Sequence, residues 1–225
     1  MTATLVGATG LIGSHLLQEL LNDPYFNTVR ILIRRPMDIT HPKLEKKIVD
    51  FNDSDSLLVA LSNSDVVFCA IGTTNKKVKG DKDAYRKIDF DITVKLARFC
   101  KMTGCEKFIL VSSIGADSKS NRFYLQLKGE VEDAIKEIAR PDNTVGRGLR
   151  SLHIMRPSLL LGDRKEFRLG EDFGKVFMIA FSFLVPSKYK AMQAKDVAKA
   201  MAAIAKKSKE GVFVYEYKEI MELIR

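Results

Sequence analysis

Short apolar segments alternate with longer amphipathic segments along the chain as far as residue 155. The short segments are predominantly apolar and are bounded by turn-forming or charged residues, a pattern typical of strands buried on both faces of a sheet. They occupy residues 3–6, 29–33, 47–49, 66–71, 108–111 and 152–155. The longer segments predict helices because their apolar residues recur at helical spacing. They occupy residues 11–21, 54–61, 81–102 and 121–138.

This order of elements predicts the fold class. Strands that alternate with helices form a parallel sheet covered on both faces, so we expect an α/β protein with a doubly wound, Rossmann-type sheet. The crossover between the second and third strands is about a dozen residues long and contains Pro36 and Pro42, so it is expected to lack a full helix.

The alternation weakens after residue 155. The pattern predicts helices at 173–184, 195–207 and 219–223 and a strand at 212–217. We expect one domain, 1–225, in which residues 160–210 contribute a small lobe on the substrate side, over the sheet edge where open α/β sheets bind ligands. The apolar run 176–185 has about half the length of a transmembrane helix. It predicts a buried helix, with a patch facing lipid or a partner as the alternative.

Composition narrows the class of protein. The chain has 225 residues, of which 46% are hydrophobic and 29% charged, and its formal net charge is +9. These values are typical of a folded globular domain. The positive charge suits an anionic cofactor as well as nucleic acid or a membrane surface. Because no nucleic-acid-binding motif and no transmembrane segment is evident, neither partner is expected.

The cysteines and the N-terminal sequence bear on location. Cys69, Cys100 and Cys105 form no CxxC pair, which indicates reduced thiols rather than a disulfide scaffold. The chain enters a glycine turn directly, without the pattern of a secretory signal. Together these features predict a cytoplasmic protein. The three histidines are scattered without metal-ligand spacing, so no metal site is expected.

A glycine-rich turn, Gly7-Ala-Thr-Gly10-Leu-Ile-Gly13, separates the first predicted strand from the first predicted helix. Glycine lets the backbone approach a pyrophosphate, and the helix N-terminus offers free N–H groups to it. The spacing departs from the usual G-x-G-x-x-G, and a tight strand-to-helix turn without a ligand is the alternative. The residues expected here to bind a dinucleotide are Gly7, Thr9, Gly10, Leu11, Ile12 and Gly13.

The choice between NAD and NADP is expected at the end of the second strand. An acidic residue there binds the ribose 2′-hydroxyl of NAD, whereas arginine accommodates the 2′-phosphate of NADP. Arg34 and Arg35 follow this strand, which favours NADP(H) over NAD(H); two solvated surface arginines are the alternative. Asp50 and Phe51 follow the third strand and are expected to meet the adenine.

Tyr124 and Lys128 lie four residues apart on a predicted helix and therefore share a face. A nearby ammonium favours the phenolate form of tyrosine, so Tyr124 is a candidate general acid or base. Ser112 and Ser113, at the end of the fifth strand, supply hydroxyls to hold a substrate oxygen. Because YxxxK is common by chance, an ordinary surface Tyr and Lys are the alternative.

These motifs together resemble the short-chain dehydrogenase/reductase superfamily over nearly the whole chain. The segments that carry the resemblance are residues 7–13, 50–51, 70–74, 111–113, 124–128 and 156–157. The chain is similar over longer segments to an atypical branch of this superfamily, the Tat-interacting-protein-like oxidoreductases. These are residues 68–74, 112–117, 124–132 and 156–164.

The resemblance implies an NADP(H)-binding Rossmann fold with a catalytic Ser-Tyr-Lys site. Ser113 matches the serine that orients the carbonyl, with Ser112 as second choice. Tyr124 matches the proton donor or acceptor, and Lys128 the lysine that holds the nicotinamide ribose. The remaining cofactor residues that it implies are Ala70, Ile71, Gly72, Thr73, Ser112, Arg156 and Pro157.

One position departs from the family pattern. Many relatives carry asparagine on the fourth helix where this chain has Asp89, which puts a proton relay through that position in doubt but leaves the Ser-Tyr-Lys core intact.

Three functions are consistent with these residues. The first is an NADP(H)-dependent oxidoreductase that acts on an apolar carbonyl or alcohol. The second is an NADPH-binding sensor or scaffold with a protein partner and little turnover, and the third is a sugar-nucleotide epimerase or dehydratase. The Tyr124/Lys128 pair favours the first over the second, since a sensor has no need of it. The short chain disfavours the third.

Overall fold

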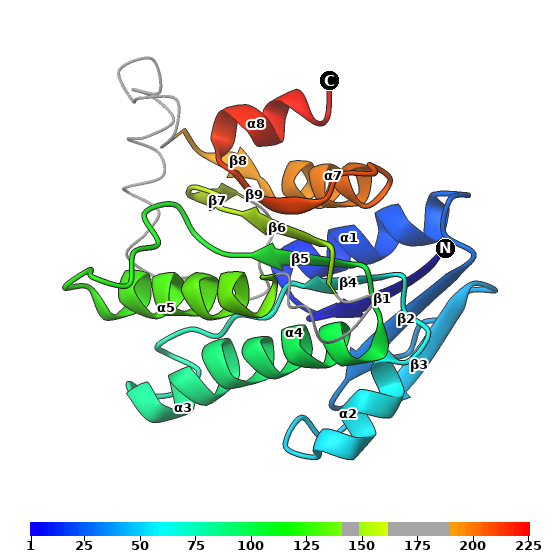
Figure 1. Cartoon of the computed structure of the whole chain (residues 1–225), viewed down its shortest axis with the longest axis horizontal. Helices are drawn as coiled ribbons and strands as arrows, with labels where there is room; N and C mark the ends of the chain where they lie inside the picture. The colour runs from blue at the N-terminus through cyan, green and yellow to red at the C-terminus, as the bar shows by residue number, and fades with distance from the viewer. Residues whose placement is uncertain (141–148, 162–189) are drawn as a thin grey trace.

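A single parallel sheet forms the centre of the protein. The computed structural model describes residues 1–140, 149–161 and 190–225. Within them, seven parallel strands have the order β3-β2-β1-β4-β5-β6-β9 (Figure 1). The strands are β1 (Thr2–Val6), β2 (Thr28–Ile33), β3 (Leu44–Ile48), β4 (Val66–Cys69), β5 (Lys107–Val111), β6 (Ser151–Met155) and β9 (Gly211–Tyr215). The chain moves outward from β1 in both directions, so the predicted doubly wound α/β fold is confirmed.

Helices cover both faces of this sheet (Figure 1). One layer contains α1 (Leu11–Asn22) and α7 (Ala194–Ala205), with α8 (Tyr217–Glu222) beside α7. The other layer contains α2 (Ser54–Leu61), α3 (Lys82–Arg86), the π-helix η1 (Lys87–Asp91), α4 (Ile92–Thr103) and α5 (Phe123–Ile138). The long helix predicted at 81–102 is therefore present, with one wider turn in its middle.

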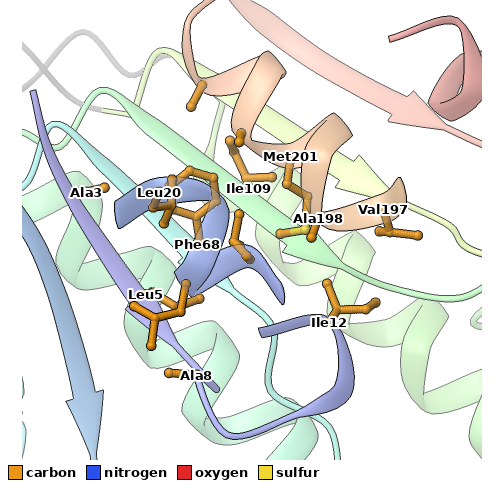
Figure 2. Packing of buried hydrophobic residues seen from close by; sticks show 14 of the residues in the cluster. Ala3, Leu5, Ala8, Ile12, Leu20, Phe68, Ile109, Val197, Ala198 and Met201 are labelled. Carbon is orange, nitrogen blue, oxygen red and sulfur yellow. The ribbon is translucent and has the colours of Figure 1, made fainter. Parts of the chain in front are cut away.

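The inner strands β1, β2, β4, β5 and β6 each contribute side chains to two apolar clusters, because successive residues point to opposite faces. Ala3 and Leu5 of β1 face the cluster under α1 and α7, whereas Val6 faces the cluster under α2, α4 and α5. Figure 2 shows the first cluster, in which Met201 and Ala198 of α7 lie near Ile109 of β5. Burial on both faces explains why the strands are apolar along most of their length.

Several predicted boundaries change. β4 ends at Cys69, so Ala70 and Ile71 belong to the following loop, and β3 begins earlier than predicted. The connection between β2 and β3 contains no helix across residues 34–43, as expected.

The lobe expected over residues 160–210 stays a prediction, because residues 162–189 are not among the described residues. α7 packs on α1 in the main helix layer, where it buries apolar side chains, and β9 pairs with β6 at the edge of the main sheet. β7 (Leu160–Leu161) and β8 (Met192–Gln193) form a separate two-stranded sheet. The helix predicted at 173–184 lies outside the described residues. Among the helices that are described, none is both long and apolar enough to cross a membrane.

A buried lysine closes the C-terminal end of α7. The ammonium of Lys107, at the start of β5, donates to the carbonyl oxygens of Ala205 and Lys207, both at 2.7 Å. These carbonyls lack partners within the helix, and the negative end of the helix dipole attracts the cation. Lys107 thereby joins the central sheet to the helix layer.

We predict that Lys107→Met lowers the free energy of unfolding by about 2 kcal/mol, because the apolar stem remains while the last carbonyls of α7 lose a charged donor. Chemical denaturation measures this change. Lys199→Met, on the exposed side of α7, is the matched control and should change the value by less than about 0.5 kcal/mol. Equal effects of the two substitutions would contradict the capping role.

Candidate functional site

The glycine turn brings the start of α1 against the ends of β1 and β4. Gly7 has a φ of +94°, a conformation that favours glycine, and a Cβ there would lie 2.5 Å from the carbonyl oxygen of Ala70. A Cβ on Gly13 would overlap the carbonyl of Gly7. The turn therefore requires glycine at both positions, as the dinucleotide-binding motif does.

The N-terminus of α1 is open to an anion. Its N-cap is Gly10, which forms no side-chain cap, and the first turn contains no acidic residue. Thr9 is exposed beside it and Leu11 is half-buried, whereas Ile12 points into the apolar core. Of these predicted cofactor residues, Ile12 can offer a ligand only its backbone.

A hollow of about 460 Å³ lies at the carboxyl ends of β2 and β3. It brings together Arg34, Asp50 and Phe51, the residues predicted for the adenosine end of the cofactor. Arg35 is exposed but does not line it. Lys87 and Ile88 of η1 do line it and were missed, because the sequence does not indicate that this helix turn faces the ends of β2 and β3.

Tyr124, Lys128 and Glu132 form a line along one face of α5, each four residues from the next. The Lys128 ammonium lies 5.9 Å from the centroid of the Tyr124 ring. Tyr124 is 41% exposed and Lys128 is 6% exposed. The predicted pair therefore meets at one place, with the phenol open to solvent and the ammonium buried beneath it.

Asp89 of η1 binds the buried ammonium. Its Oδ1 atom lies 2.8 Å from Lys128 Nζ, and its Oδ2 atom accepts a hydrogen bond of 2.8 Å from the backbone N–H of Thr73. Burial lowers the pKa of Lys128, but the attraction of Asp89 together with that of Tyr124 and Cys69 outweighs burial and raises that pKa above its ordinary value. Lys128 is therefore a cation at neutral pH. The sequence flagged Asp89 as a departure but gave no sign of this contact.

The structure distinguishes the two candidate serines. Ser112 is buried, and its hydroxyl donates to Glu132 Oε1 at 2.6 Å. Ser113 is half-buried, and its hydroxyl makes only a long 3.3 Å contact with the carbonyl of Ile114. Ser113 thus has the more accessible hydroxyl of the two, and the roles of both serines stay predictions.

Arg156 binds the same carboxylate. Its guanidinium makes two hydrogen bonds to Glu132, at 2.9 and 2.6 Å, and lies 3.7 Å from Glu216. Glu132 is fully buried and the Arg156 side chain is 22% exposed, so the guanidinium pairs with the carboxylate at the border between interior and surface. Next to it, the carbonyl of Pro157 accepts from the N–H of Ile114 at 3.0 Å, which joins the loops after β5 and β6.

The loop after β4 lies at the same carboxyl edge of the sheet as the glycine turn. Ala70 lies against the glycine turn, Ile71 packs on the second apolar cluster and Gly72 is exposed. Thr73 is held at both backbone groups, since its carbonyl accepts from the Tyr85 hydroxyl at 3.0 Å. The predicted cofactor residues therefore lie at one edge of the sheet.

A doubly wound sheet with an open glycine turn after its first strand defines a dinucleotide-binding Rossmann protein. A family described as NAD(P)H-binding matches residues 7–208 of the sequence. The chain belongs to this NAD(P)H-binding family.

Relatives and solved structures agree with this assignment. Protein HTATIP2 of Rattus norvegicus is 35% identical over 77% of this chain and 68% of its own length, and the resemblance inferred from the motifs is confirmed. Protein FMP52, mitochondrial, of Eremothecium gossypii is 31% identical over 100% of this chain and 98% of its own. The structure of MoeE5 in complex with UDP-glucuronic acid and NAD has a TM-score of 0.73 at 19% identity. It covers 99% of this chain and 80% of that one, and shows the shared fold.

The predicted cytoplasmic location is contradicted by these comparisons. Relatives from Candida albicans, Candida glabrata and Emericella nidulans are named as mitochondrial proteins. All three cysteines are free and buried, as expected for reduced thiols.

We predict that Gly13→Ala lowers the free energy of unfolding by about 1–3 kcal/mol, because the added methyl group overlaps the Gly7 backbone. Gly72→Ala is the matched control, since the only atom within 4 Å of a Cβ there is Asp89 Oδ1, at 4.0 Å. Thermal and chemical denaturation compare the two variants. An unchanged stability of Gly13→Ala would show that α1 can shift away from the turn.

Proposed function

We propose that the protein is an NADP(H)-dependent oxidoreductase of the short-chain dehydrogenase/reductase type that acts on a carbonyl or alcohol substrate. The observation that carries this proposal is the arrangement on α5, where the exposed phenol of Tyr124 lies above the buried ammonium of Lys128. A dinucleotide sensor would have no need of this pair. The half-buried hydroxyl of Ser113, at the end of β5, supports the same reading.

The residues present fit a dinucleotide. The uncapped N-terminus of α1 suits the pyrophosphate. Gly7 and Gly13 allow the tight turn that brings this N-terminus against the ends of β1 and β4. The hollow with Arg34 suits the adenosine end. Arg34 and Lys87 both line it, and two cations favour a 2′-phosphate over a hydroxyl.

NADPH bound in this way supplies a hydride to the substrate carbon. The Ser113 hydroxyl donates a hydrogen bond to the carbonyl oxygen, and the Tyr124 phenol delivers a proton to that oxygen as the alcohol forms. In the reverse direction the phenolate removes the proton of the alcohol. Lys128 favours the phenolate by its charge and donates to the ribose.

The substrate is proposed to be an apolar carbonyl compound or alcohol. Its apolar character rests on Phe167, Phe173, Phe177 and Phe181, which lie outside the described residues. Incubation with NADPH and a panel of aldehydes, ketones and quinones, followed through the absorbance of the reduced nicotinamide, identifies the substrate class. NADPH binding that alters a protein interaction, with no turnover of any compound, would favour the sensor.

We expect the protein to bind NADPH about ten- to a hundredfold more tightly than NADH, because a charged contact to the 2′-phosphate contributes about 1.5–3 kcal/mol. Arg34→Asp should abolish this preference. Arg35→Asp makes the same charge change at the adjacent residue, which is exposed and does not line the hollow, and should have a much smaller effect. Fluorescence titration with both cofactors measures the affinities, and equal wild-type affinities would overturn the NADP assignment.

Tyr124→Phe should lower turnover by about a hundred- to ten-thousandfold while NADPH affinity changes little, because it removes only the proton-donating oxygen. Tyr25→Phe is the matched control, since Tyr25 is 42% exposed and Tyr124 41%, and it should retain full activity. The comparison uses a substrate from the panel and separate measurement of kcat and KM. Full turnover by Tyr124→Phe would exclude the proposed mechanism.

A further inference from the structure

The carboxylate of Asp89 lies where the loop after β4 meets α5. One oxygen binds the ammonium of Lys128 and the other accepts from the amide of Thr73, both at 2.8 Å. Asp89 is 1% exposed, so water does not compete for either bond. A single side chain thus connects the loop predicted to lie beside the cofactor with the lysine predicted to hold the ribose.

The chemistry of the two contacts requires a carboxylate. The ammonium and the backbone N–H are both donors, and an aspartate presents two acceptor oxygens. An asparagine has one acceptor oxygen, and its NH₂ group would face one of the two donors. An aspartate at position 89 therefore suits a direct hydrogen bond from the Lys128 ammonium, which an asparagine would suit less well.

The helix geometry brings further residues to the same loop. Tyr85, Asp89 and Thr93 are four residues apart, and the wider turn of η1 keeps them closer to one face than 3.6 residues per turn would. Tyr85 donates to the Thr73 carbonyl at 3.0 Å, and Thr93 lies 3.8 Å from Cys69 Sγ at the end of β4. Residues of α3, η1 and α4 thus contact the end of β4 and the loop that follows it from one side.

We propose that Asp89 is a positioning residue that holds the Lys128 ammonium and the Thr73 loop in one fixed arrangement, an inference that rests on the proposed function because the cofactor role of Lys128 does. Displacement of the loop would then move the lysine, and loss of the lysine contact would release the loop. In this arrangement the loop after β4 and helix α5 move together.

The electrostatic surroundings of Lys128 make this inference testable. The titratable groups around its ammonium are Asp89 from η1, Tyr124 on its own helix and Cys69 from β4. Burial raises the pKa of Cys69, so this thiol stays neutral. Glu132, one turn further along α5, is bound by Arg156. Without Asp89 the effect of burial dominates, and the pKa of Lys128 should fall.

The experiment compares wild type, Asp89→Asn and Asp91→Asn, the last an exposed aspartate on the same helical turn. Nitrogen NMR of labelled lysine follows the Lys128 ammonium against pH, and hydrogen exchange follows the Thr73 amide. In Asp89→Asn we expect Lys128 to lose its proton at least about one pH unit lower and the Thr73 amide to exchange faster. NADPH affinity should fall about tenfold at neutral pH and further as pH rises through the lowered pKa of Lys128. Asp91→Asn should match wild type.

These measurements distinguish a failure of the role proposed for Asp89 from a failure of the proposed function. An ion pair with only a structural role would lower thermal stability without moving the Lys128 titration or the pH dependence of NADPH affinity, and that result would overturn the proposal. Wild-type protein that binds no NADPH would instead refute the proposed function, while the lysine titration and amide exchange still test the role of Asp89. If Asp89→Asn fails to fold, a folded double variant with Lys128→Met supports the coupling, because no buried charge is then left unpaired. An equally unfolded double variant would contradict it.

Discussion

All seven strands of the main sheet run parallel, and this constraint gathers the carboxyl end of every strand at one edge. Residues distant in sequence meet there, because the chain returns to the same starting edge through a helix or loop before each new strand. The glycine turn after β1, the arginine after β2 and the serine after β5 therefore belong to one surface. The order of the strands sets how far each of these residues lies from the N-terminus of α1.

Buried carboxylates connect the helix layer to this edge. Glu132 of α5 binds Ser112 after β5 and Arg156 after β6, and Asp89 of η1 binds Lys128 and the loop at Thr73. A carboxylate removed from water is stable only when charged or polar donors surround it, and both sites satisfy this condition. The same bonds that make burial tolerable thus fix the positions of the loops around the proposed reaction site.

Some polar groups at this site bond within the protein, whereas others remain open to a ligand. Ser112 and Arg156 both bond to Glu132, which joins the ends of β5 and β6 to α5. Ser113 and Tyr124 remain accessible and can meet a ligand. Neighbouring serines of the same chemistry differ in role because successive residues at a strand end point in opposite directions. The motif contains both serines, and the packing of α5 buries one hydroxyl and leaves the other accessible.

The sequence by itself determined the alternation of strands and helices, the absence of a helix between β2 and β3, and the glycine turn with its dinucleotide chemistry. These features are local, since periodicity, proline and glycine act within a few residues. Only the tertiary structure decided that Ser112 and Arg156 turn to Glu132, that Lys87 joins Arg34 at the hollow, and that Asp89 bonds Lys128. It also placed α7 in the main helix layer. Each of these outcomes depends on which elements become neighbours across the sheet, and that information is not carried by the spacing of residues within any one element.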